Sequence, residues 1–171
     1  GIIDVQRESF LGEVVEPDAS KSVTNWQTSE EWAILETAIR RDQSVIEKAA
    51  HDSGVSARLI VANLVAEQLR LFFTEREAFK KWFSPLKILG PQTQFSWGVM
   101  GMKEDTAIQV EQHLKDRTSP YYLGEPYADL LDLPATTTDQ KTARFVRMTD
   151  QHDHYWSYLY AGLYLKQIEA Q

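Results

Sequence analysis

Cysteine is absent from this sequence of 171 residues, and no apolar run reaches the length of a membrane span. Without cysteine there is no disulfide framework and no thiolate zinc site. A spanning helix needs about 20 consecutive apolar residues, and a signal peptide needs a charged start followed by an apolar stretch. We therefore expect neither in these residues. Because the first residue is Gly1 rather than methionine, we expect a mature form or an excised piece.

Basic residues are outnumbered by acidic ones, 18 against 25, which gives a formal net charge of -7 and an isoelectric point near 5.1. Proteins that bind nucleic acid through its phosphates need dense positive charge, and no basic run of that density occurs here. We therefore expect no nucleic-acid partner. The oligomeric state is not indicated by the composition.

Apolar residues make up 43% of the chain and aromatic residues 11%, enough for one substantial core and one domain. Residues 1–27 contain Gly12 and Pro17 and show no helical period, so we expect an extended N-terminal arm followed by a helical domain over 28–171. Apolar spacing predicts helices over 28–51, 55–73, 104–116 and 150–170, and one helical turn over 127–131. The first is expected to begin with a capping box of Thr28 and Glu31. With no convincing strand beyond the arm, the predicted fold class is mainly α.

A carboxylate interrupts the apolar stripe of the helix predicted over 55–73. Ile60, Leu64 and Leu71 lie on one face, and the position that completes the stripe is Glu67. One interpretation is structural: Glu67 pairs with Arg70 or Arg58, or lies where the stripe meets solvent. The other is catalytic, because a carboxyl group in an apolar wall can stay protonated and act as a general acid.

The stretch SWGVMGMK, residues 96–103, joins two flexible glycines to large apolar side chains just before a predicted helix. Gly98 and Gly101 allow positive φ and a close approach of the backbone to a ligand, while Met100 and Met102 can wall a cleft. The alternative is a tight connection whose methionines fill the core.

The two segments GVSARLIVANLVAEQ and SWGVMGMKEDTA together resemble the lytic transglycosylase and goose-type lysozyme group of the lysozyme-like superfamily. In that group a helix ending in a catalytic glutamate precedes a glycine- and methionine-containing turn and then a helix opened by Thr-Ala. Glu67 matches the glutamate, residues 96–102 match the turn, and Thr106 and Ala107 match the helix start. The segment GLYLK at 162–166 is similar to a later helix of the group.

The resemblance implies a lysozyme-like fold and cleavage of the β-1,4 bond between N-acetylmuramic acid and N-acetylglucosamine in peptidoglycan. Glu67 would be the general acid and base, with no cofactor and no metal. The partners would be peptidoglycan glycan strands, and the location would be the cell envelope, periplasmic or extracellular. The substrate-binding residues would be Gln68, Ser96, Trp97, Gly98, Val99, Met100, Gly101 and Met102, together with Tyr158 from the tyrosine-rich last helix, because tyrosine rings stack on sugar faces.

Two positions differ from the pattern of that group: Gln68 replaces a serine, and Gly101 or Lys103 stands where a glutamine is usual. The interval over 75–95 is also longer. An alternative is therefore a catalytically silent glycan-binding or scaffold module with protein partners in a cell-envelope or secretion assembly. A metal site at His152 and His154 is not expected, because side chains two apart on a helix diverge. We expect Asp150 or Asp153 to cap the helix there.

Overall fold

The computed structural model describes residues 26–74 and 98–171, and within these ranges the chain forms helices and connecting segments without a β-strand. The mainly α class is confirmed. The expected N-terminal arm lies outside the described residues except for its last two positions, and of these Trp26 is buried in the core. The helices are α3 (Glu30–Arg41), α4 (Gln43–Ser53), α5 (Ala57–Thr74), α7 (Glu104–Lys115), α8 (Glu125–Ala128), α9 (Gln140–Met148) and α10 (Tyr155–Glu169).

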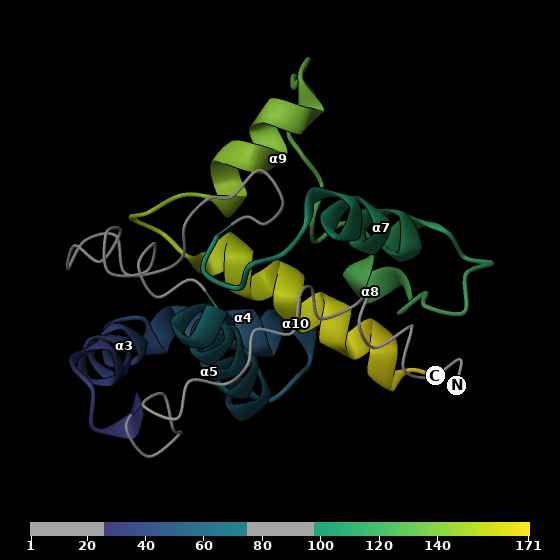
Figure 1. Ribbon diagram of the computed structural model, residues 1–171. Helices are drawn as coiled ribbons and strands as arrows, with labels where there is room; N and C mark the ends of the chain where they lie inside the picture. Colours follow the sequence, from purple (N-terminus) through teal and green to yellow (C-terminus); the bar gives the residue numbers. More distant parts are fainter. Residues whose placement is uncertain (1–25, 75–97) are drawn as a thin grey trace, which may run out of the picture.

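Helix α10 runs through the middle of the molecule, with α3, α4 and α5 on one side and α7, α8 and α9 on the other (Figure 1). Every residue from 157 to 163 is buried. Helix α4 packs most extensively along α10, and Gly162 permits the approach, because a Cβ there would lie 2.9 Å from the Cβ of Ser53. The core therefore surrounds α10 rather than lying on one face of it.

The single helix expected over 28–51 is two helices, and the break falls at Asp42, which ends α3 and begins α4. The Asp42 carboxylate points into the core, where it accepts hydrogen bonds from Nδ1 of His154 over 2.6 Å and from the hydroxyl of Tyr158 over 2.8 Å. The expected capping box is also wrong in register. The Ser29 side chain caps α3 by accepting from the backbone N–H of Trp32 over 3.2 Å.

Helix α9 was not predicted, because the face it buries carries an arginine. Arg144 is only 6% exposed, and its guanidinium donates two hydrogen bonds of 2.7 Å to the carboxylate of Glu111 on α7. Nearby, Arg147 stacks over the ring of Trp156 at 4.5 Å and donates to the backbone oxygen of Leu131 over 2.7 Å. Ion pairing, not an apolar stripe, therefore fixes α9 against α7 and α10.

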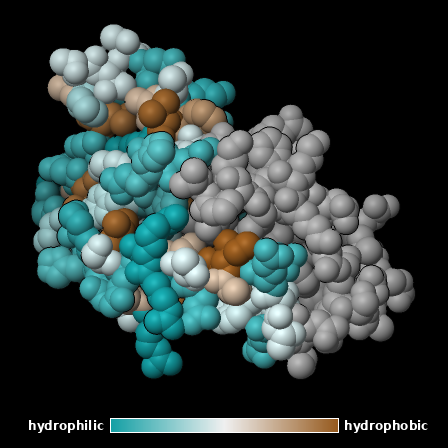
Figure 2. Space-filling model, turned by 90° about the vertical axis from the view of Figure 1, so that its left-hand side faces the viewer, coloured by the Kyte–Doolittle hydropathy of each residue, from teal (hydrophilic) through white to brown (hydrophobic). Residues whose placement is uncertain are grey.

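On the face drawn in Figure 2, hydrophobic atoms of the described residues form small groups between hydrophilic ones. None of the helices within residues 26–74 and 98–171 is both long and apolar enough to span a membrane. The exposed large apolar side chains of the described residues include Tyr164 and Ile168, one turn apart on α10.

Candidate functional site

A cavity of about 610 Å³ lies where α5, the turn after residue 98, α7 and α10 meet. It combines charged, amide and apolar side chains, and it contains Glu67 together with part of the predicted turn. The structure therefore brings the interrupted stripe and the glycine-rich stretch together at one cavity. The lining residues are Asn63, Ala66, Glu67, Arg70, Met100, Gly101, Met102, Lys103, Thr106, Ala161, Tyr164 and Leu165.

Helix α5 places Glu67 at the edge of its buried face. Ile60 and Leu64, the preceding members of the stripe, are completely buried. Glu67 continues the stripe at the next turn, but its side chain keeps 18% of its surface exposed because the cavity opens there. The carboxylate thus has apolar core behind it and accessible space in front of it.

Arg70 forms the ion pair that the sequence left open as one alternative for Glu67. Its Nη2 lies 2.8 Å from Oε1 and its Nε lies 3.1 Å from Oε2, so the guanidinium engages both carboxylate oxygens. The Arg70 side chain itself is 50% exposed. The pair therefore has its acidic end largely buried and its basic end half exposed to solvent.

The turn that faces Glu67 has the backbone conformation that its glycines predict. Gly98 and Gly101 have φ of 67° and 61°, and the N–H of Gly101 donates to the oxygen of Gly98 over 3.2 Å. A Cβ at Gly101 would come within 2.7 Å of Cδ of Glu67. Only glycine therefore allows this backbone to lie directly against the carboxylate.

Two predicted binding residues support the turn instead of lining the cavity. Gln68 is 1% exposed and Val99 is 3% exposed. Nε2 of Gln68 donates to the backbone oxygen of Val99 over 3.2 Å and ties α5 to the turn. The side chains of both residues point into the core, so their predicted contact with substrate is replaced by a positioning role.

Gly98 and Tyr158 also lie outside the cavity lining. A Cβ at Gly98 would come within 2.5 Å of Oγ of Ser157 and would overlap the backbone oxygen of Met148, so this glycine serves close packing. Tyr158 is completely buried and bonds Asp42. Among the tyrosines of α10, Tyr164 lines the cavity in its place. Ser96 and Trp97 lie outside the described residues.

The histidines before α10 have unrelated environments. His152 is exposed, whereas His154 is buried and donates to Asp42. Burial acts to raise the pKa of the Asp42 carboxyl, but its hydrogen bonds from His154 and Tyr158 outweigh burial and hold that pKa below its usual value. Within the described ranges, no group of three or more His, Asp or Glu side chains is arranged to hold a metal ion.

The loop before α10 is organised by both aspartates that were predicted to cap it. Oδ1 of Asp150 accepts from the N–H groups of His152 and Asp153, over 2.8 and 3.2 Å. Oδ1 of Asp153 accepts from the N–H of Tyr155 over 2.9 Å, at the first residue of the helix. The aspartates thus shape the entry to α10, although the residue directly before the helix is His154, whose side chain makes no cap hydrogen bond.

Several lining residues were not predicted from the sequence as part of a cavity. Asn63 precedes Glu67 by four positions and Arg70, predicted only as an ion-pair partner, follows it by three, and both spacings place side chains on one face of α5. Thr106 lies in the first turn of α7, where the sequence indicates it only as part of the resemblance. Helical spacing would therefore have found Asn63, but the approach of α7 depends on the tertiary fold.

Comparisons of the chain with protein-family models, with curated proteins and with solved structures gave no match. The function is therefore inferred from the residues around the cavity.

Proposed function

We propose that this chain is a peptidoglycan-cleaving enzyme of the lytic transglycosylase or lysozyme type, with Glu67 as its general acid and base. The observation that carries the proposal is the placement of one carboxylate on a cavity wall, directly against the glycine backbone of the turn at Gly101. The lysozyme-like character of the helical domain is part of the same proposal. This character is supported by the order of two segments in the sequence, the helix that carries Glu67 and the turn over 96–102, and by the fact that both contribute residues to this cavity.

The surroundings of Glu67 suit transfer of a proton to a bound glycan. Met100 and Met102 supply apolar walls, and backbone near Gly101 is accessible to amide and hydroxyl groups of a sugar. A carboxyl group placed between core and cavity can reach a glycosidic oxygen, and such acid catalysis contributes about a hundredfold or more to rate.

Glu67 is the sole carboxylate among the described residues that line the cavity. Retaining and inverting glycosidases use two carboxylates, so a single one favours a substrate-assisted route. In this route the acid of Glu67 protonates the glycosidic oxygen as the bond to C1 of muramic acid breaks, and the substrate's own N-acetyl group supports the positive centre. The muramyl 6-hydroxyl then attacks C1 and returns its proton to Glu67, which leaves a 1,6-anhydro end.

Arg70 must release at least one oxygen of Glu67, and the freed carboxylate must take up a proton from solvent, before Glu67 can act as the acid. In the described state both oxygens accept from the guanidinium. The Arg70 side chain is half exposed, so water can replace one of these hydrogen bonds when a glycan enters. Cleavage of peptidoglycan would place the protein in the cell envelope, periplasmic or extracellular.

The same ion pair favours a second candidate function, a catalytically silent module that binds glycan or serves as a scaffold for cell-envelope proteins. If Arg70 stays on Glu67 when glycan is bound, the carboxylate cannot donate a proton and the pair is structural. The positions Gln68 and Gly101, which differ from the lysozyme-like pattern, are consistent with this candidate.

Incubation with purified peptidoglycan sacculi, followed by mass analysis of the released fragments, tests the proposal. We expect soluble fragments with 1,6-anhydro ends, and reducing ends would instead indicate a hydrolase. Release should be lost in Glu67→Gln and retained in Glu36→Gln, which breaks a comparable 2.7 Å pair with Arg40 on the exposed face of α3. A folded wild-type protein that binds sacculi but releases nothing would support the silent module.

A further inference from the structure

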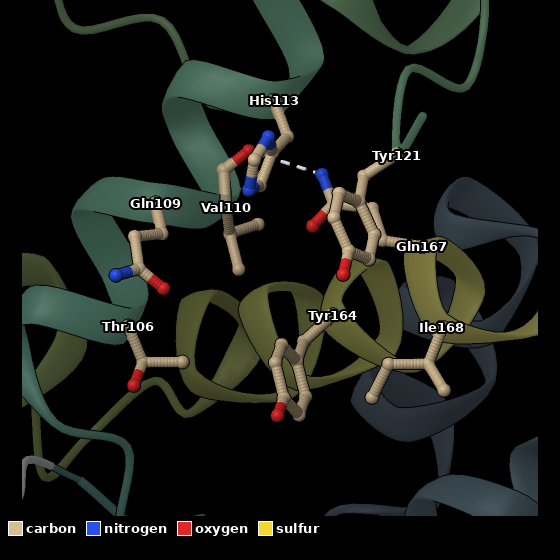
Figure 3. A pocket seen from close by; sticks show the side chains of 8 residues that line it. All are labelled: Thr106, Gln109, Val110, His113, Tyr121, Tyr164, Gln167 and Ile168. Carbon is tan, nitrogen blue, oxygen red and sulfur yellow. Dashed lines mark hydrogen bonds between the residues drawn. The ribbon is translucent and has the colours of Figure 1, made fainter. Parts of the chain in front are cut away.

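A second, smaller cavity of about 200 Å³ lies beside the Glu67 cavity, between α7 and α10. Figure 3 shows its walls: Thr106, Gln109 and His113 come from α7, Tyr164 and Gln167 from α10, and Tyr121 from the segment after α7. Thr106 and Tyr164 line both cavities. The two spaces are therefore neighbours with a common wall, and one extended ligand can occupy both.

The chemistry of the second cavity differs from that of the first. Among the described residues that line it there is no Asp, Glu, Lys or Arg, whereas Glu67, Arg70 and Lys103 line its neighbour. Aromatic rings, side-chain amides and one threonine hydroxyl share the surface with two aliphatic side chains. A neutral ligand with an apolar face and a polar edge fits such a lining, because rings cover the face while amides and hydroxyls bond the edge.

The polar side chains of this cavity are held in place before a ligand arrives. Nδ1 of His113 lies 2.8 Å from the hydroxyl of Ser119, and its ring packs on Tyr121 at 4.7 Å between centroids. Nε2 of Gln167 donates to the backbone oxygen of Val110 over 3.1 Å, as the dashed line in Figure 3 shows. Fixed donors and acceptors lower the entropic cost of binding, so these contacts mark a prepared site.

Tyr164 gives this region its exposed ring. Its side chain belongs to the few large apolar ones left exposed among the described residues, with 41% of its surface accessible. In Figure 3 its ring lies across the floor of the cavity, opposite Gln109 and below Tyr121. An exposed ring beside fixed amides suits stacking against a sugar face.

We propose that this cavity binds one neutral N-acetylhexosamine ring of a glycan strand whose next linkages lie at Glu67. Its volume is below the roughly 300–1,000 Å³ of sites for drug-sized ligands, which suits a single ring. The strand would pass over Thr106 and Tyr164, the wall that both cavities share. This inference rests on the proposed function, because it extends the same glycan beyond the acid.

The test uses N-acetylated chito-oligosaccharides of two and four sugars, titrated calorimetrically into the Glu67→Gln protein so that no turnover occurs. We expect the tetramer to bind more tightly than the dimer. Adding Gln109→Ala or Tyr121→Ala should weaken tetramer binding about 3- to 10-fold, the usual effect of one lost hydrogen bond or contact, and leave dimer binding nearly unchanged. Adding Gln112→Ala, an exposed glutamine on α7 outside both cavities, is the matched control and should change neither.

The proposal would be overturned if neither oligosaccharide bound or if both bound with equal affinity. It would also be overturned if the tetramer bound Gln109→Ala and Tyr121→Ala as tightly as it binds the protein without these changes. Circular dichroism of each variant verifies the fold. The result is separable from the proposed catalysis. If the protein cleaves sacculi but binds the tetramer and the dimer equally, the proposed catalysis stands and this binding site does not. If the tetramer binds more tightly but sacculi are not cleaved, the binding site stands and the catalytically silent module is favoured.

Discussion

The carboxylate of Glu67 lies against the backbone of Gly101, where a Cβ atom would come within 2.7 Å of the Glu67 Cδ. The two residues are 34 positions apart in the chain. Their contact places an acid, a flexible turn and an open cavity at one point. The predictions below test this contact and the interactions that hold the surrounding helices.

Glu67→Gln should reduce the rate of sacculus cleavage by at least about a hundredfold, because glutamine cannot donate a carboxylic proton. Its free energy of unfolding should fall by no more than about 1 kcal/mol, because the ion pair is half exposed at its Arg70 end. Cleavage rates and urea unfolding of Glu67→Gln and Glu36→Gln would be measured together. If Glu67→Gln cleaved sacculi near the wild-type rate, the carboxylate of Glu67 would have only a structural role.

Gly101→Ala should displace the Glu67 carboxylate and reduce cleavage, besides costing about 1–2 kcal/mol for a side chain at positive φ. Gly124→Ala is the control for backbone strain, because Gly124 has φ of 99° but a Cβ there meets only Cδ of Pro126 at 3.6 Å. Because its ψ of 169° places Gly124 in a region that only glycine occupies readily, we expect a loss of stability at least as large as that of Gly101→Ala, with unchanged cleavage. Equal cleavage by both variants would contradict a role for the contact at Gly101.

Gly98→Ala should reduce stability more than Gly101→Ala does. At Gly98 the added atom meets the backbone oxygen of Met148, which cannot turn aside, whereas at Gly101 it meets the flexible end of Glu67. The folded fraction of Gly98→Ala should keep its rate of cleavage, because Gly98 does not line the cavity. Thermal unfolding and the rate per folded molecule distinguish the two glycines. If Gly98→Ala were stable but inactive, Gly98 would contact the substrate, as the sequence predicts.

Asp42→Asn should reduce the free energy of unfolding by about 1.5–3 kcal/mol, because a charged acceptor of two buried hydrogen bonds is lost. Arg41→Gln is the control: it removes the 3.1 Å surface pair of Arg41 with the same carboxylate and should cost less than about 1 kcal/mol. Urea unfolding at neutral pH gives both values. If the free energy of unfolding falls equally in the two variants, the hydrogen bonds from His154 and Tyr158 do not stabilise the break between α3 and α4.

Asp52→Asn should be less stable than the wild type at neutral pH, by an amount that shrinks in acid. The hydrogen bond from Lys48, followed by that from the hydroxyl of Tyr155, lowers the pKa of Asp52 to about 2. An unfolded aspartate has a pKa of about 3.9, so the unfolded chain takes up the proton first as pH falls. The stabilisation is therefore complete above about pH 4 and is lost toward pH 2. Urea unfolding across this range would contradict the assignment if the difference stayed constant.

The amino-acid sequence by itself determined the helical class, the positions of α5 and α7 within two residues, and the positive φ of Gly98 and Gly101. These features are local, because an apolar stripe specifies a helix wherever it packs, and glycine alone tolerates a left-handed turn cheaply. The same local rules singled out Glu67, since a carboxylate in an apolar stripe is visible without any neighbour.

Tertiary structure alone decided which polar groups are buried and what they contact. The break at Asp42 and the existence of α9 depend on His154, Tyr158 and Glu111, which lie between 33 and 116 positions from the residues they bond. Buried polar groups require partners, and no local spacing reveals a partner on another helix. The sequence also predicted Tyr158 as a binding residue, whereas Tyr164 lines the cavity. Only the packing of α10 against α4 and α7 decides which tyrosine faces the cavity.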